Sequence, residues 1–298
     1  MYKIKVGLLG SSGLVGEEYR KRLANHPFFE LVFAPKRETL FDVDRAKECA
    51  LIFSALPSGI AQEVDLLYVK EDRPVFSSAS CHRMKKEVPL IIPEINGEKL
   101  KTTYGGIIAK PNCTLQSMLL PLYPLHQAFG LKKVAATYLQ ATSGAGKDFS
   151  LTNNIIPYIE GEEEKSLNET HKILGDASIV MSIHCNRVPV TFGHLACISA
   201  SFAKKPALEE VKACWEAFQG LDLPTAPTKP LIYREENDRP QIEKDLEETM
   251  AVTIGRLRPC ELFDIRFTAL SHNLVRGAAG GGILTAEYFA KEHLLCAV

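Results

Sequence analysis

The sequence predicts an α/β protein in which a doubly wound, mostly parallel sheet is followed by a second domain with longer strands. Short apolar runs alternate with helical patterns from residue 3 to residue 109, as in parallel strands that are buried on both faces. A glycine cluster, residues 10–16, follows the first of these runs directly. From residue 134 the segments are longer and alternate between apolar and polar side chains, which is typical of antiparallel strands. At 298 residues, the chain is long enough for two such domains.

The composition is that of an ordinary globular protein, with 46% hydrophobic and 24% charged residues. The formal net charge of −1 gives no electrostatic reason to expect binding to nucleic acid or to a membrane surface. No apolar run approaches the roughly 20 residues that cross a bilayer, and the first residues run straight into a strand pattern without an export signal. The eight cysteines form no C-x-x-C pair. We therefore expect a cytoplasmic protein with free thiols and no metal site.

The first strand–turn–helix unit carries a variant of the dinucleotide fingerprint. Residues 3–9, KIKVGLL, predict a buried strand, and a helical pattern extends to Leu23. The G-x-x-G-x-x-G sequence between them allows a tight turn, close approach of the backbone to a pyrophosphate, and close packing of helix on strand. A glycine-rich turn without a ligand is the alternative. The expected nucleotide-binding residues are Gly10, Ser11, Ser12, Gly13, Leu14, Val15 and Gly16.

The residues after the second predicted strand, 30–34, bear on the choice of coenzyme. In a site for NAD, an acidic residue near the end of this strand would bind the ribose 2′-hydroxyl. The chain has Lys36 and Arg37 there, and two cations suit the 2′-phosphate of NADP. Glu38 beside them weakens this interpretation, and a solvated loop is the alternative.

Three further strands are expected in the first domain, over residues 50–56, 74–79 and 89–95. Ligands of doubly wound sheets bind beyond the carboxyl ends of the strands. We therefore expect the segment around residues 80–83 and the end of the third strand to face the ligand. The residues at the end of that strand are Ser54, Ala55, Leu56 and Pro57.

The second domain is predicted from alternating segments and the helices between them. Strands are expected over residues 134–141, 183–190, 194–203, 250–258 and 262–269. Residues 207–218 have a helical pattern, and residues 223–230 have the prolines of a surface loop. Residues 283–295 have helical periodicity, and this closing helix could pack back on the first domain.

Cys113 stands at a predicted strand-to-helix junction, in the sequence K-P-N-C-T-L-Q-S. An apolar run precedes it at residues 106–109, and a helical pattern follows at residues 115–129. Backbone N–H groups and the positive end of the helix dipole favour a thiolate at such a junction, and the thiolate is the nucleophile. Asn112 is of a type suited to capping the helix. The alternative is a small buried cysteine of the core.

Two further segments carry candidate chemistry. Residues 140–146, Q-A-T-S-G-A-G, end a strand in small residues that leave space for a ligand, although the same pattern suits an ordinary turn. Arg187 and His194 lie on a strand pair interrupted at Gly193. A histidine alone is more often structural, but with a nucleophilic cysteine His194 is a candidate general acid/base. The charged run at residues 160–165 has the composition of a solvated surface.

In this order, the segments resemble aspartate-semialdehyde dehydrogenases, most closely the archaeal and fungal-like branch. The matching pieces cover nearly the whole chain: GSSGLVG, SALPS, SSASCHRM, VPLIIPEIN, PNCT, QATSGAG, EEEKSLNETHKILG, CNRVPVTFGH and HNLVRGAAGGGILTAE. The resemblance implies a Rossmann-type, NADP-binding domain over residues 1–114 and 272–298. It also implies an α+β catalytic and dimerisation domain, with a mixed and largely antiparallel sheet, over residues 115–271.

The resemblance implies a role for each site residue. Cys113 matches the nucleophile, His194 the acid/base, and Gln140 the residue that orients the acyl group. The matched substrate-binding residues are Arg187 for the α-carboxylate, Glu162 for the ammonium group, Lys165 and Arg83 for the phosphate, and Asn112 beside the nucleophile. Ser143, Gly144 and Asn273 match cofactor-binding positions, with Asn273 near the nicotinamide amide.

The implied reaction is the reversible, NADPH-dependent reduction of L-aspartyl 4-phosphate to L-aspartate 4-semialdehyde with release of phosphate, in amino-acid biosynthesis. A thiolate displaces phosphate to give a thioester, which accepts hydride where a carboxylate does not. The resulting thiohemiacetal requires an imidazole with a pKa near neutrality. The implied partners are the small-molecule substrate and further copies of the chain, as a homodimer or homotetramer.

Two other functions remain open at this point. An N-acetyl-γ-glutamyl-phosphate reductase would run the same chemistry on a substrate without an ammonium group, which would leave Glu162 without a use. A non-catalytic nucleotide-binding paralogue would have no use for Cys113 together with His194. The segment at residues 34–44 is shorter than is usual in the family, and this shortening bears on the adenosine pocket and on coenzyme preference.

Overall fold

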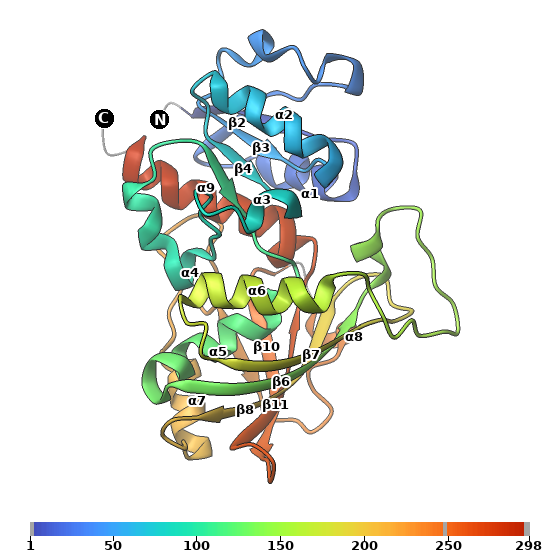
Figure 1. Cartoon of the computed structure of the whole chain (residues 1–298), viewed down its shortest axis with the longest axis vertical. Coiled ribbons are helices and arrows are strands. Elements are labelled where there is room, and N and C mark those ends of the chain that lie inside the picture. Colours follow the sequence, from blue (N-terminus) through green and yellow to red (C-terminus); the bar gives the residue numbers. More distant parts are fainter. Residues whose placement is uncertain (1–2, 247–248, 295–298) are drawn as a thin grey trace. The chain divides into compact units, whose positions relative to one another are not determined.

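In a computed structural model the chain forms two compact units, and the structure describes residues 3–246 and 249–294 (Figure 1). The first unit extends through Pro111 and takes up the segment Asp222–Thr225 and the chain from Ala278 onward. The second unit comprises Asn112–Leu221 and Ala226–Gly277. The units therefore divide three residues before and six residues after the predicted boundaries at 114 and 271, and Asp222–Thr225 is an addition to the first unit. Residues 1, 2 and 295–298 of the predicted first domain lie outside the described residues.

The first unit is a parallel sheet of five strands in the order β2-β1-β3-β4-β5. Its strands are β1 (Ile4–Leu9), β2 (Phe29–Phe33), β3 (Leu51–Ser54), β4 (Val75–Ser77) and β5 (Ile107–Ala109). Its helices are α1 (Leu14–Leu23), α2 (Ser58–Lys70), α3 (Ser80–Arg83), α4 (Pro93–Asn96) and α9 (Gly280–His293), with 3₁₀ turns η1 (Arg37–Thr39), η2 (Val43–Ala46) and η3 (Gly97–Thr102). The predicted doubly wound sheet is confirmed.

The strand predicted over residues 89–95 is wrong. Only Leu90 makes an isolated bridge, to Ala109, and the chain then enters the short helix α4. Pro93 at the first helical position suits a helix start, and the side chain of Asn96 accepts the N–H of Ile92 at 3.0 Å. A short apolar run does not distinguish a buried strand from other buried backbone. The fifth strand of the sheet is β5, the run that precedes Cys113.

Aromatic side chains form the core of the first unit and bring in the C-terminal helix. Phe53 packs against Tyr19 of α1 and Phe29 of β2, and Phe76 packs edge-on against Phe289 of α9 at 5.6 Å between ring centroids. These contacts explain why α9 belongs to the first unit although it comes last in the chain. This helix was predicted over residues 283–295, and it begins earlier, at Gly280. The last residue of the predicted range lies outside the described residues.

The second unit is a mixed sheet of six strands in the order β7-β6-β8-β11-β10-β9. The strands are β6 (Leu131–Gln140), β7 (Val180–Arg187), β8 (His194–Phe202), β9 (Leu231–Arg234), β10 (Val252–Pro259) and β11 (Ile265–Ser271). The pairs β6–β7 and β9–β10 are parallel, and the other three pairs are antiparallel. The predicted mixed, largely antiparallel sheet is confirmed, but strand β9 was not predicted.

Helices cover one face of this sheet. They are α5 (Leu115–Phe129), which packs on β6, β8, β10 and β11, α6 (Glu162–Leu174), which packs on β7, and α7 (Leu208–Ala217), which packs on β9. Shorter helical segments are η4 (Thr142–Ala145), α8 (Ile242–Asp245) and the π-helical η5 (Val275–Ala279). Trp215 of α7 donates its indole N–H to the carbonyl of Pro121 in α5 at 2.9 Å. Among the described helices, none has both the length and the apolar character needed to cross a membrane.

Candidate active site and dinucleotide pocket

Cys113 and His194 form a close pair in the second unit. Cys113 lies two residues before the start of α5, and His194 is the first residue of β8. The distance between Cys113 Sγ and His194 Nε2 is 3.2 Å. The side chain of Asn112 shapes the turn, because its Oδ1 accepts hydrogen bonds from the backbone N–H and the hydroxyl of Thr114, at 3.1 and 2.9 Å. Nucleophile and imidazole are therefore within hydrogen-bonding distance, the geometry that covalent catalysis by cysteine requires.

The backbone selects the tautomer of His194. The N–H of Ala141 donates to His194 Nδ1 at 3.1 Å, so Nδ1 is an acceptor and the neutral ring carries its proton on Nε2. The side chain is fully buried. Burial, followed by the charge of Arg187, lowers the pKa of His194 to about 3. The sequence-based expectation of an imidazole with a pKa near neutrality is therefore wrong for this state of the site: His194 is a neutral Nε2–H donor that faces Cys113.

Arg187 lies beside this pair at the end of β7. In the parallel pairing of β6 with β7, Gln140 is the register partner of Arg187. The Nη1 of Arg187 donates to the carbonyl of Ala141 at 2.7 Å and to Gln140 Oε1 at 3.5 Å. Only 5% of Arg187 is exposed, and burial lowers its pKa below the ordinary value. The structure thus brings three of the predicted residues, His194, Gln140 and Arg187, together at the ends of adjacent strands.

Gly144, Ser143 and Asn273 lie around His194 and Arg187. A Cβ atom on Gly144 would lie 2.7 Å from Arg187 Nη1 and 3.3 Å from His194 Cε1, so a side chain at this position would displace the guanidinium of Arg187. Asn273 accepts the N–H of Gly193 at 2.9 Å and donates to the hydroxyl of Ser143 at 2.8 Å. These bonds join the start of β8 to the 3₁₀ turn after β6. The cofactor-binding roles expected for Ser143, Gly144 and Asn273 stay predictions.

Residues 112–114 form the turn that carries Cys113, called the cysteine turn below. Helix α6 brings the acidic and basic residues of the expected substrate site to this turn. Glu162 Oε2 accepts the side-chain N–H of Asn112 at 2.6 Å, and Glu162 Oε1 pairs with Lys165 at 3.1 Å. The charged run at residues 160–165, which by composition suits a solvated surface, therefore includes the first turn of a helix that borders the site. Arg83, the remaining expected phosphate ligand, belongs to the first unit and donates to the carbonyl of Ser78 at 2.8 Å.

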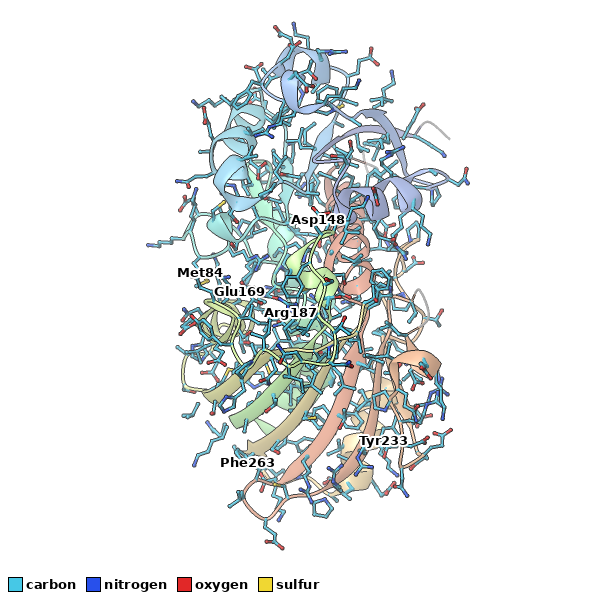
Figure 2. The ribbon with its side chains drawn as sticks, turned by 90° about the vertical axis from the view of Figure 1, so that its right-hand side faces the viewer. Met84, Asp148, Glu169, Arg187, Tyr233 and Phe263 are labelled. Atoms are coloured by element: carbon cyan, nitrogen blue, oxygen red, sulfur yellow. The ribbon has the colours of Figure 1, made fainter. Side chains whose placement is uncertain are left out.

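Two residues that contact the cysteine turn were not predicted. Glu169 Oε2 accepts the backbone N–H of Asn112 at 2.6 Å, and Glu169 lies at the same end of the sheet as Arg187 (Figure 2). Gly277 packs directly on Cys113, because a Cβ atom there would lie 2.7 Å from Cys113 Cβ. The sequence marks both only weakly: Glu169 lies seven residues after Glu162, on the same face of a helix, and Gly277 lies in a glycine-rich stretch.

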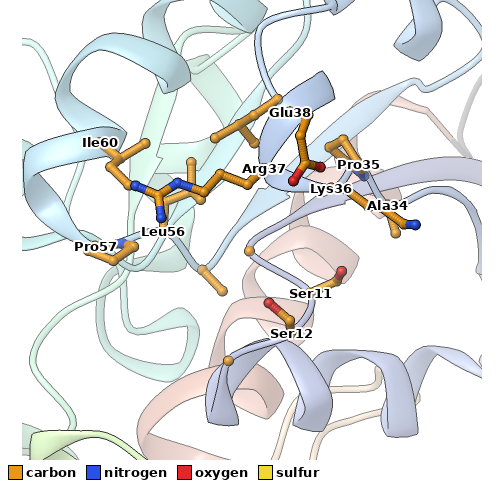
Figure 3. Close-up of a pocket in the computed structure, with 14 residues that line it drawn as sticks. Ser11, Ser12, Ala34, Pro35, Lys36, Arg37, Glu38, Leu56, Pro57 and Ile60 are labelled. Carbon is orange, nitrogen blue, oxygen red and sulfur yellow. The ribbon is translucent and has the colours of Figure 1, made fainter.

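In the first unit, the glycine turn after β1 borders a cavity of about 620 Å³ (Figure 3). Its lining comprises Gly10, Ser11, Ser12, Gly13, Ala34, Pro35, Lys36, Arg37, Glu38, Leu40, Ala55, Leu56, Pro57 and Ile60. The guanidinium of Arg37 reaches towards Pro57 and Ile60, whereas Lys36 points in another direction (Figure 3). Of the nucleotide-binding residues expected in the first unit, Leu14, Val15, Gly16 and Ser54 are outside this lining.

The glycine turn fits a dinucleotide phosphate. Gly10 has a φ of +76°, and a Cβ atom there would lie 2.8 Å from the carbonyl oxygen of Ala55. A Cβ atom on Gly16 would overlap the carbonyl of Gly10, so α1 approaches the turn without a side chain in between. The backbone at the start of α1 is thus open to an anion. Across residues 3–246 and 249–294, no group of three or more His, Cys, Asp or Glu side chains is arranged to hold a metal ion.

Comparison with known proteins places both units in one family. Residues 35–103 match the family model "Semialdehyde dehydrogenase, NAD binding domain", and residues 122–276 match "Semialdehyde dehydrogenase, dimerisation domain". The aspartate-semialdehyde dehydrogenase of Archaeoglobus fulgidus is 36% identical, with 98% of this chain and 100% of that protein covered. The enzyme of Aspergillus fumigatus is 35% identical, with 96% of each chain covered.

The fold agrees with solved structures. A crystal structure of aspartate semialdehyde dehydrogenase with NADP from Candida albicans has a TM-score of 0.88 and 31% identity, with 98% of this chain and 99% of that chain covered. A Vibrio cholerae aspartate semialdehyde dehydrogenase II has a TM-score of 0.86 at 23% identity, which supports the fold alone. With the cysteine–histidine pair and the glycine turn in place on this fold, the chain belongs to the aspartate-semialdehyde dehydrogenase family.

Proposed function

We propose that the protein is an NADP-dependent, phosphorylating aspartate-semialdehyde dehydrogenase. It reduces L-aspartyl 4-phosphate to L-aspartate 4-semialdehyde, reversibly and with release of phosphate. The observation that carries this proposal is the distance of 3.2 Å between Cys113 Sγ and His194 Nε2, with Arg187 beside them. The relatives that match this chain over nearly their whole length are named aspartate-semialdehyde dehydrogenase.

The first chemical step is acyl transfer to Cys113. The Nε2–H of His194 donates to Sγ and stabilises the thiolate, because a hydrogen bond to a charged group favours its charged form. The thiolate attacks the acyl carbon of aspartyl phosphate, the C–O bond to phosphate breaks, and phosphate leaves with the electron pair. The product is a thioester on Cys113. The proposed step starts from the thiolate, so His194 acts in it as a hydrogen-bond donor and not as a base.

The second step reduces the thioester. NADPH, when bound, supplies the hydride for this reduction. Addition of hydride to the thioester carbon places negative charge on its oxygen, and a neutral Nε2–H group near Cys113 can donate to that oxyanion. When the carbonyl re-forms, the C–S bond breaks and the thiolate of Cys113 leaves, again opposite the same N–H. Gln140, next to Arg187 on β6, is the proposed orienting group for the acyl oxygen.

Substrate recognition is assigned to the charged residues around Cys113. Arg187 binds the α-carboxylate, since a guanidinium has five N–H donors and can hold both the carbonyl of Ala141 and a carboxylate. Glu162 binds the ammonium group, and Lys165 binds the phosphate. The phosphate-binding role expected for Arg83, which belongs to the first unit, stays a prediction. Asn112 is held between Glu162 and Thr114 and completes this set. Recognition of the ammonium group is what separates this function from that of an N-acetyl-γ-glutamyl-phosphate reductase.

The coenzyme and the assembly complete the proposal. The glycine turn, Lys36 and Arg37 would hold NADP, with the cations at the 2′-phosphate. Residues 35–103 of the chain match an NAD-binding domain, and the C. albicans enzyme was crystallised with NADP. The match of residues 122–276 to a dimerisation domain supports a homodimer or a pair of such dimers. The cytoplasmic location expected from the sequence stays a prediction.

The test is phosphate-dependent reduction of NADP by the purified protein with aspartate semialdehyde. We expect NADPH to form only when both phosphate and aspartate semialdehyde are present, and Cys113→Ser to form none above background while still binding NADP. Activity with N-acetylglutamate semialdehyde in place of aspartate semialdehyde would assign the protein to the related reductase. An intact, NADP-binding protein without activity on either aldehyde would show that it is a non-catalytic paralogue.

A further inference from the structure

We propose that Glu169 is a positioning residue for the nucleophile: it holds the peptide that precedes Cys113 and thereby sets the approach of Cys113 to His194. This inference rests on the proposed function, because it concerns the same site. Its basis is the hydrogen bond from the N–H of Asn112 to Glu169 Oε2, with an N···O distance of 2.6 Å.

Helix α6 forms two hydrogen bonds with Asn112. Glu162 and Glu169 are seven residues apart, which is about two helical turns, so their side chains lie on one face of the helix. Glu162 accepts the side-chain N–H of Asn112 at 2.6 Å, and Glu169 accepts its backbone N–H at the same distance. A rigid helix that holds both the main chain and the side chain of one residue determines the orientation of the next residue, Cys113.

The other hydrogen bonds of Asn112 shape the turn but do not place it. Its Oδ1 bonds to Thr114, and its carbonyl accepts the N–H of Leu115 at 3.2 Å. These partners follow Cys113 directly in the chain and would move with it. The bonds to Glu162 and Glu169 lead to a different element, and they relate the turn to helix α6.

Burial makes the bond to Glu169 strong and its loss costly. Glu169 is only 1% exposed, so its carboxyl group must find partners within the protein. A hydrogen bond to a carboxylate is shorter and stronger than one between neutral groups. On another side of Cys113, Gly277 leaves no room for a shift, because a Cβ atom there would lie 2.7 Å from Cys113 Cβ. Cys113 is therefore confined on one side by Gly277 and on another by the peptide of Asn112, which Glu169 holds. A misplacement of about 1 Å at such a site can cost about 100-fold in rate.

The test compares variants that change the reach of the side chain with variants that change its charge. Glu169→Gln keeps an acceptor oxygen at the same distance from the helix, whereas Glu169→Asp keeps the charge but withdraws it by one methylene group. Glu164→Ala, on the exposed face of α6, is the matched control. The measurements are kcat and KM for aspartate semialdehyde, thermal unfolding, and the rate constant for alkylation of Cys113 by iodoacetamide between pH 6 and 9.

We expect Glu169→Gln to stay within about fivefold of wild type in kcat and in the alkylation rate of Cys113. Glu169→Asp should lose at least about 30-fold in kcat and about 10-fold in alkylation rate, with KM within about threefold, because the charged substrate ligands Arg187, Glu162 and Lys165 are unchanged. Should Glu169→Asp fail to fold, Glu169→Met, which fills the space without an acceptor, takes its place. Unchanged alkylation and kcat in a folded Asp or Met variant would overturn the proposal, as would an equal loss in the Gln and Asp variants.

The alkylation rate separates failure of this inference from failure of the proposed function. It measures the environment of Cys113 without substrate or coenzyme. If wild type lacks activity with aspartate semialdehyde, the proposed function fails, and the comparison of alkylation rates still decides whether Glu169 positions Cys113. A purely structural role for Glu169 predicts a lower unfolding temperature with alkylation of the folded protein unchanged.

Discussion

At the scale of single residues, the thiols differ in how readily they ionise. Burial raises the pKa of Cys49 to about 11 and that of Cys185 to about 12, so both remain protonated at neutral pH. For Cys260, burial acts in the same direction, but hydrogen bonds from the backbone N–H groups of Phe263 and Leu262 outweigh it and lower the pKa below its ordinary value. Cys113 is set apart by its partner, the N–H of His194.

We therefore expect iodoacetamide at pH 7 to alkylate Cys113 and Cys260 well before the other described cysteines. Turnover should be lost in step with modification of Cys113 alone, as followed by mass spectrometry of peptides. Cys260→Ser is the control, and it should keep wild-type activity and the same rate of inactivation. Inactivation that follows Cys260 and leaves Cys113 unmodified would contradict the assignment of the nucleophile.

His194 should make stability depend on pH in acid. Its native pKa of about 3 lies below the ordinary value of about 6.5, so the unfolded chain binds a proton in a range where the native protein does not. The stabilising contribution is therefore complete above about pH 6.5 and is lost as pH falls towards 3, by roughly 1.4 kcal/mol for each pH unit.

Replacement of His194 tests this origin. In urea unfolding at pH 7, 6, 5 and 4, His194→Asn should lose less free energy of unfolding with falling pH than wild type does. The asparagine side chain keeps much of the shape and does not titrate. Parallel pH dependence in the two proteins would show that the acid lability arises elsewhere. Any acid limb of kcat/KM near neutral pH should also stay in place, because His194 is already neutral there.

At the scale of elements, the π-helical segment η5 limits the space for the nucleophile. A Cβ atom on Gly277 would lie 2.7 Å from the Cβ, 3.0 Å from the Cα and 3.1 Å from the carbonyl oxygen of Cys113, and most of these are backbone or near-backbone atoms that cannot rotate away. Gly277→Ala should therefore displace Cys113 and lower kcat by about 100-fold or more. Gly105→Ala, where a Cβ atom meets nothing within 4 Å, is the control. Wild-type kcat in folded Gly277→Ala would show that the turn tolerates the shift.

The segment after β2 carries the prediction on coenzyme choice. Lys36 and Arg37 line the cavity beside the glycine turn, but so does Glu38. We expect the double variant Lys36→Ala/Arg37→Ala to raise KM for NADPH by about 10-fold or more and KM for NADH by less than about threefold, since only NADPH has the 2′-phosphate. Lys70→Ala, at the end of α2 and outside the cavity lining, is the control. Equal effects on both coenzymes would place these cations away from the 2′-phosphate.

At the scale of the whole molecule, the described part of the second unit has one sheet face that no helix covers. The helices α5, α6 and α7 pack on one face, and the other has a depression of about 370 Å³ lined in part by Thr137, Cys197, Arg258, Arg266 and Thr268. All residues that line this depression lie within residues 122–276, which match a dimerisation domain. We expect this face to pair two copies of the chain.

Thr268→Glu should therefore lower the mass of the protein in solution, as measured by light scattering during gel filtration, from a multiple of the chain mass to a single chain. A carboxylate that is buried in an interface loses water, and this loss disfavours the pairing. Glu209→Lys, on the exposed side of α7, should leave the mass unchanged. An unchanged mass for Thr268→Glu would place the interface on another surface.

Much of this protein follows from the sequence alone. Parallel strands buried on both faces appear as continuous apolar runs, so the first sheet was predictable. The glycine turn after the first of these runs was predictable too, and a cavity lies beside it. Cys113 at the strand-to-helix junction and the mixed second sheet were predictable for the same reason, because local pattern and chain order carry the information. The prediction failed at residues 89–95, because a short buried apolar run has no periodicity that distinguishes a strand from a short helix such as α4.

The tertiary structure decided what depends on distance and burial. Whether His194 is charged follows from the desolvation of its ring, the charge of Arg187 and the N–H of Ala141, and these groups come from three different strand ends. The contacts of Glu169 and Gly277 with the cysteine turn join residues that are 57 and 164 positions apart. Local sequence sets the conformation of a turn, but the electrostatics and placement of a catalytic group depend on neighbours that only the packed fold brings together.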